Sequence, residues 1–129
     1  MACALVGALC SGNFSNQQGP IVEGLQAELP VPETFSLVSH TTISKLSHAS
    51  SSRSYTCPSP YPEIKSFYVS ALEQRGWRLV RERPIRSWGK SYGGFSLEFS
   101  RAEYRVLVQY AGTPEPPYGW DYAISVSWE

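Results

Sequence analysis

The sequence lacks long apolar runs, an excess of charge of either sign, and the cysteines that a zinc site or a disulfide framework needs. No apolar stretch approaches the roughly 18 residues that cross a bilayer as a helix. The 11 basic residues balance the 11 acidic ones, which excludes a disordered acidic chain and a surface made throughout for nucleic acid. The three cysteines, at positions 3, 10 and 57, have spacings that fit no metal or redox motif. The sequence therefore predicts neither a structural metal nor a bound cofactor.

Apolar and aromatic side chains, in contrast, are plentiful. Of the 129 residues, 42% are apolar and 13% aromatic. A chain of this length buries roughly two-thirds of the surface that it exposes when unfolded. We therefore expect one domain whose core needs no disulfide bonds.

The first ten residues, MACALVGALC, are small or apolar and are followed by the polar, turn-forming SGNFSNQQGP. This segment resembles the end of a secretory signal, and more specifically of a bacterial lipoprotein signal, in which a short apolar run ends at a lipid-bearing cysteine. It departs from that pattern in having no basic residue before Lys45 and in placing Leu9 directly before Cys10. The prediction is that residues 1–10 are a signal remnant with Cys10 as the acylated residue. The alternative is a short terminal element that frays or docks on the domain.

The organisation of the chain changes near residue 34. Residues 11–33 combine glycine and proline with Asn, Gln and Ser, which favours a flexible lead-in over a core element. A single domain over residues 34–129 then begins with FSLVSHTTI, where two faces alternate as in a strand. The serine-rich SKLSHASSSRS that follows is typical of a solvated loop, before a short strand at residues 54–57.

One segment has helical spacing. It follows CPSPYP, in which a proline suits the first turn of a helix. Gly76 suits the left-handed backbone conformation in which helices commonly end. Between them, apolar side chains recur every three or four residues at Ile64, Phe67, Tyr68, Ala71 and Leu72.

After Gly76 the alternation of a strand returns. Residues 77–82, 95–99 and 104–110 predict three strands, and the tight turn at residues 100–103 makes the last two antiparallel. Residues 120–128 predict a final strand after a proline-rich loop. The predicted fold class is α+β: a twisted antiparallel sheet in the order β-β-α-β-β-β-β, with one helix packed on one face and the other face solvated.

The helix and its exit, FYVSALEQRGWRLVRE, carry a family resemblance, together with the upstream LPVPETFSLVSHTTI. A helix containing Phe-Tyr, three residues, Leu, three residues and Gly-Trp, followed by a strand, is similar to a pattern in small secreted and lipoprotein-like bacterial domains of unknown function. The resemblance covers roughly residues 30–129. It implies an envelope location and a compact sheet with one helix, and it implies no chemistry.

Residues that could carry catalysis are few. His40 and His48 lie in or beside the serine-rich stretch, and either could pair with Cys57 or a serine, but no nucleophile motif surrounds them. Two histidines without accompanying carboxylates or cysteines do not make a metal site. We therefore expect the protein not to be an enzyme.

Charge is distributed unevenly along the chain. Residues 75–90 carry six basic side chains against Glu82 alone, with tryptophans interleaved. Such a surface can hold phosphates and stack rings, or contact anionic lipid headgroups. Alternatively, alternate arginines simply occupy the solvated face of a strand. The candidate surface consists of Arg78, Arg81, Arg83, Arg86, Trp88 and Lys90.

A second candidate surface is the loop TPEPPYGW, which places Tyr118 and Trp120 beside three prolines. Rigid loops of this kind display rings for binding, although the rings could equally fold onto the sheet edge. The predicted function is a non-enzymatic, envelope-associated or secreted domain that binds a protein or an envelope component. The alternative is a cytoplasmic module that binds nucleic acid or protein through residues 75–90.

Overall fold

The computed structural model describes residues 17–87, 89–114 and 116–129. Within them the chain forms two helices and six strands. The elements are α2 (Gln18–Glu28), β1 (Ser36–Lys45), β2 (His48–Thr56), α3 (Tyr61–Glu73), β3 (Arg78–Ser87), β4 (Lys90–Arg101), β5 (Tyr104–Tyr110) and β6 (Tyr122–Trp128). The expected combination of helix and antiparallel sheet is confirmed, but the expected order is wrong because α2 precedes the first strand.

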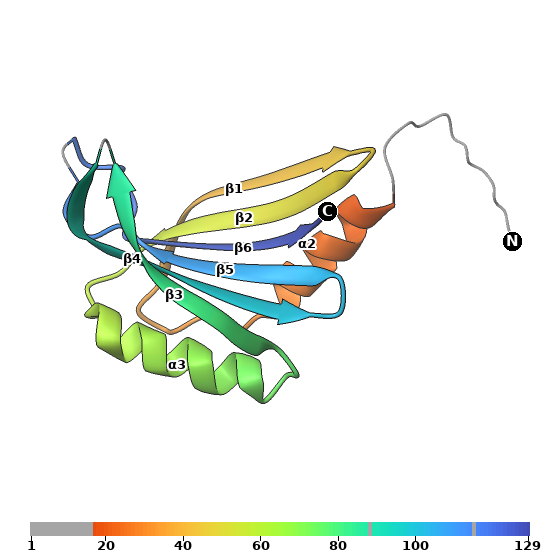
Figure 1. Ribbon diagram of the computed structural model, residues 1–129, viewed down its shortest axis with the longest axis horizontal. Helices are drawn as coiled ribbons and strands as arrows, with labels where there is room; N and C mark the ends of the chain where they lie inside the picture. The colour runs from red at the N-terminus through yellow and green to blue at the C-terminus, as the bar shows by residue number, and fades with distance from the viewer. Residues whose placement is uncertain (1–16, 88, 115) are drawn as a thin grey trace, which may run out of the picture.

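All six strands belong to one antiparallel sheet, in the spatial order β1-β2-β6-β5-β4-β3 (Figure 1). The strand β6 joins the β1–β2 hairpin to the meander of β3, β4 and β5. On one side it pairs with β2, from Ala49↔Trp128 to Tyr55↔Tyr122. On the other side it pairs with β5, from Tyr104↔Trp128 to Tyr110↔Tyr122. The two edges of the sheet are therefore β1 and β3.

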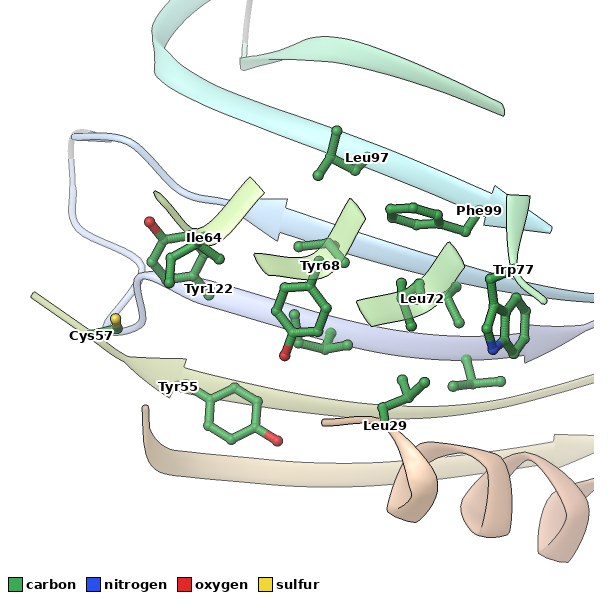
Figure 2. Packing of buried hydrophobic residues seen from close by; sticks show 14 of the residues in the cluster. Leu29, Tyr55, Cys57, Ile64, Tyr68, Leu72, Trp77, Leu97, Phe99 and Tyr122 are labelled. Carbon is green, nitrogen blue, oxygen red and sulfur yellow. The ribbon is translucent and has the colours of Figure 1, made fainter. Parts of the chain in front are cut away.

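Both helices pack on the same face of the sheet, and their apolar side chains enter one core cluster. The helix α2 lies against β1, β2 and β6, whereas α3 lies toward β3 (Figure 1). Figure 2 shows Ile64, Tyr68 and Leu72 of α3 among side chains of the sheet, with Leu29, just after α2, nearby. Strands contribute alternate residues to this core, among them Leu97, Phe99, Val106, Val108, Tyr122, Ile124 and Val126.

The helix α3 forms where the apolar spacing predicted it. It buries Tyr61, Ile64, Tyr68 and Leu72, and a proline occupies its first turn. Gly76 has a φ of 85°, in the left-handed region, and reverses the chain as expected. The sequence was therefore sufficient to predict this helix and its end.

The prediction that residues 11–33 are a flexible lead-in is wrong for α2, whereas residues 11–16 lie outside the described residues. Val22 and Gln26 are buried on one side of α2. A Cβ added to Gly19 would lie 3.0 Å from the Cβ of Ser44, so glycine permits the helix to approach β1 closely. Because Val22 belongs to the common core, the packed domain includes residues 18–33 as well as 34–129.

The strand β2 corrects a second prediction, that the serine-rich stretch is a loop. Its residues pair with β1 on one side and with β6 on the other. Ala49, Ser51 and Tyr55 are buried toward the helices, and the alternate serines lie on the other face. Serine has little preference for strands, so pairing on both sides decides the conformation of this segment.

Candidate functional site

The edge strand β3 carries four arginines of the predicted basic segment, and three of them project from one face of the sheet. The register with β4 places Arg78 opposite Ser100, Arg81 opposite Glu98, and Arg83 opposite Ser96. Directly paired residues of an antiparallel sheet project from the same face. On β4, Ser96, Glu98 and Ser100 alternate with Leu97 and Phe99, which face the helices. The three arginines therefore lie on the face of the sheet that no described helix covers.

A fourth arginine joins them from β5. Arg105 pairs with Ser100, which itself pairs with Arg78, so the two arginines lie in one row across three strands. We call Arg78, Arg81, Arg83 and Arg105 the arginine face. The sequence reasoning missed Arg105 because it lies outside the basic run. The alternation of YRVLVQY, together with the tight turn before it, is the signal that could have placed it there.

The arginine face contains one carboxylate among its described positions, that of Glu98. Its oxygen Oε1 lies 3.2 Å from Nε of Arg81, and its other oxygen, Oε2, accepts a hydrogen bond from Arg105. Arg78 and Arg83 are exposed and form no ion pair with a described residue. The remaining neighbours on this face are mostly serines, so a net positive charge is left open to solvent.

The other members of the predicted basic surface lie apart from this face or outside the described residues. Arg86 pairs with Ser91 beyond an irregularity in the β3–β4 ladder, and Lys90 begins β4, so both lie at the end of that hairpin. Trp88 lies outside the described residues. The basic segment is therefore divided between a sheet face and a hairpin end.

Trp77, which the sequence places among the arginines, is not available for stacking on a ligand. Only 3% of its surface is exposed, and it closes one end of the core (Figure 2). The guanidinium carbon of Arg101 lies 4.5 Å from the centre of its ring, an intramolecular cation–π contact. The arginine face thus lacks this stacking ring.

The loop between β5 and β6, which the sequence singled out as a candidate surface, brings Tyr118 and Trp120 together. Their ring centroids are 5.3 Å apart and their planes are tilted by 33°. With Pro114 and Pro117 they line a depression of about 410 Å³. Tyr118 is 42% exposed, so the rings are displayed rather than folded fully onto the sheet.

Hydrogen bonds fix the base of this loop. The backbone N–H of Ala111 donates to the carbonyl of Asp121, and that of Asp121 donates to the carbonyl of Tyr55, each over 2.8 Å. The N–H of Cys57 donates to Oδ2 of Asp121 over 2.7 Å. Asp121 is therefore occupied as a structural acceptor, and the depression offers rings and prolines more than charge.

The residues considered for catalysis do not form a dyad. The Sγ of Cys57 is buried and contacts the hydroxyl of Thr34 at 3.2 Å, whereas Nε2 of His40 contacts the hydroxyl of Ser51 at 3.4 Å. His48 begins β2, in register with Lys45. In the described part of the chain, no three histidine, cysteine or acidic residues are grouped as metal ligands.

Searches beyond the structure itself give no relatives from which to transfer a role. No protein-family model matches the chain, and neither a curated protein nor a solved structure matches it. Among the described residues, no helix is long and apolar enough to cross a membrane.

Proposed function

We propose that the protein is a non-enzymatic domain of the cell envelope, or a secreted one, that binds anionic lipid headgroups through its arginine face. The observation that carries the proposal is the register of three neighbouring strands, which gathers four arginines around one carboxylate on an uncovered sheet face. Guanidinium groups pair well with phosphate, because their donors form a planar fork.

The flanking surface supports contact with a broad anionic layer. Serines occupy most positions of this face between the arginines and β1, and the others are Leu107, Gln109 and Ala123. None of these side chains is acidic, so none would repel an anionic layer. Each basic residue near an anionic membrane contributes about 1 kcal/mol, so the net three charges of the arginine face would supply about 3 kcal/mol. Such binding is weak without a second anchor, and acylation of Cys10, which lies outside the described residues, would supply one.

The alternative is a cytoplasmic module that binds nucleic acid. Binding of single strands usually combines basic residues with rings on which bases stack. The burial of Trp77 removes one of the rings that the sequence placed beside the arginines. We therefore favour lipid headgroups, and nucleic-acid binding is one of the outcomes that the experiment separates.

The test is sedimentation of the full chain with vesicles that contain phosphatidylglycerol or only phosphatidylcholine. Wild type should bind the anionic vesicles, and salt should weaken the binding. The double variant Arg78→Gln and Arg83→Gln should bind about 30-fold more weakly, since it removes two charges worth about 1 kcal/mol each. These two arginines form no ion pair with a described residue, so their replacement should leave the fold intact.

The matched control changes the net charge by the same amount on the helix side. Ala27 and Ser66 are exposed residues of α2 and α3, and Ala27→Glu with Ser66→Glu also shifts the charge by two units. This control should bind as wild type does. Equal loss in both double variants would show that net charge alone is responsible, and salt-sensitive binding to a single-stranded oligonucleotide without vesicle binding would favour the alternative.

A further inference from the structure

The two edges of the sheet differ in how well they resist pairing with another strand. The edge strand β3 carries Pro84, several arginines, and two irregularities in its ladder with β4. Prolines, charges and bulges are the features by which natural sheets block their edges. The edge strand β1 has ten residues, contains no proline, and carries Lys45 as its one charged residue. Its ladder with β2 has one irregularity, between Leu37 and Ser39, and the register is unbroken from Ser39 to Lys45. The β3 edge is therefore protected along its length, whereas the β1 edge is unprotected from Ser39 onward.

The unprotected strand also exposes apolar side chains. All residues of β1 except Ser44 are exposed, and no described element lies beyond it (Figure 1). Leu37 and Val38 are 60% and 52% exposed near its start. Ile43 near its end and Leu46 in the following turn are 42% and 72% exposed. Alternate backbone N–H and C=O groups of an edge strand point outward and are open to a partner strand.

The central residues of β1 suit pairing with their own copy. If Thr41 pairs with Thr41 of an identical antiparallel strand, His40 lies opposite Thr42 and Ser39 lies opposite Ile43. These pairs join hydroxyl-bearing and β-branched side chains, which stabilise neighbouring strands, and they contain no like charges. If Thr41 pairs with itself, the two Lys45 side chains lie eight strand positions apart, about 27 Å, so they do not repel each other closely.

We propose that two copies of this chain associate through their β1 strands, which pair antiparallel across a two-fold axis near Thr41. A second copy satisfies both open edges at once and leaves only the protected β3 edges, so association stops at a dimer. The axis is perpendicular to the sheet, because paired residues must project from the same face. Both arginine faces then lie on one side of the joined sheet.

A single pair of strands makes a small interface, so the dimer should be in equilibrium with monomer. Sedimentation equilibrium of the full chain should therefore show mass that rises with concentration toward twice that of the chain. Hydrogen exchange of the β1 amides should slow over the same range of concentration. A monomer at all concentrations would overturn the proposal. Hydrogen exchange of the β1 amides that is slow at every concentration would overturn it as well, because a segment of the same chain would then cover β1.

Charge complementation tests the strand and its register. Thr41 is exposed, and like charges directly opposite each other across two strands repel. We expect Thr41→Lys and Thr41→Glu each to weaken self-association at least about tenfold, and an equimolar mixture of the two to restore a dimer. The control is Val80→Lys on β3, where Val80 is 39% exposed, and it should leave association unchanged.

Two results would contradict this arrangement. Association of the Thr41→Lys variant as strong as that of wild type would show that β1 is not the contact. Loss of association in the Val80→Lys variant, with none in the Thr41 variants, would move the contact to the other edge. The proposal does not depend on lipid binding, because all of these measurements are made without vesicles.

Discussion

Tyr68 and Tyr122 are both fully buried in the core, but only one of their hydroxyl groups is hydrogen-bonded, and a pair of variants can measure the effect of this difference. The hydroxyl of Tyr122 donates to the carbonyl of Ser59 over 2.9 Å. The hydroxyl of Tyr68 has no hydrogen-bond partner among the described residues, and Figure 2 shows it directed away from α3 into the core. Burial raises the pKa of Tyr68, so the hydroxyl stays protonated and its desolvation is uncompensated.

We therefore expect Tyr68→Phe and Tyr122→Phe to change the free energy of unfolding in opposite directions. The loss of the Tyr122 hydrogen bond should destabilise the fold by about 1 kcal/mol. Removal of the Tyr68 hydroxyl should stabilise it by about 1 kcal/mol, because an unpaired buried hydroxyl costs about 1–3 kcal/mol and its loss leaves only a small void.

Urea denaturation followed by circular dichroism measures both effects. With a slope of about 2 kcal/mol per molar urea, the midpoints of the two variants should differ by about 1 M. Equal destabilisation by both substitutions would refute the reasoning, since it would mean that the Tyr68 hydroxyl has a partner, such as a buried water. A changed slope would indicate an altered unfolded state and is therefore checked first.

Two further predictions concern α2 and acid stability. Val22→Ala should lower the free energy of unfolding by about 2 kcal/mol, because it removes buried apolar surface and leaves a cavity. Ile21→Ala, at an exposed neighbouring position, should cost far less. If urea denaturation shows equal effects for the two variants, α2 does not pack on the core. Hydrogen bonds from Lys65 and Tyr61 lower the pKa of Glu82, so its stabilisation is present above about pH 4.5 and is lost as the pH falls through its lower folded value. The ion pair of Glu82 with Lys65 is partly exposed, so Glu82→Gln should lower the free energy of unfolding by about 0.5 kcal/mol at pH 7 and leave it unchanged near pH 2. The check is thermal denaturation of wild type and variant at both pH values, and an equal difference in Tm at the two would contradict this.

The sequence predicted those elements in which local pattern and tertiary packing agree. In α3 the apolar residues repeat at helical spacing, and Ile64, Tyr68 and Leu72 of that stripe are buried. In β5 and β6 the alternating residues face the core and form its centre. For these segments, the hydrophobic period alone was sufficient.

It failed where local preference and tertiary context disagree. In α2, Gly19, Pro20 and Gly24 argue against a helix, but Pro20 lies in the first turn, where its missing N–H costs nothing. Gln26 is buried where a helical stripe would have an apolar residue, which hides the period. In β2 the serines look like a loop, because nothing local shows that β6, some 70 residues later, pairs with them.

The candidate site was predicted in the same partial way. Arg78, Arg81 and Arg83 lie on the solvated face of a strand, as one of the two interpretations held. Their grouping with Arg105 depends on the register of β4 and β5, which no single segment encodes. Tyr118 and Trp120 are close in sequence, so their juxtaposition could be predicted without the fold.

The central position of β6 determines when the domain can become folded. Until residues 122–128 have been synthesised, the nascent chain holds a hairpin and a separate meander, and β2 and β5 each keep one edge open. The pairing of Tyr55 with Tyr122 closes a long loop of chain, so the entropic cost of joining the halves is met in one late step. A chain that stops before β6 leaves the open edges of β2 and β5 exposed to aggregation and proteolysis. The chain should therefore become resistant to protease only after β6 has been synthesised and has paired.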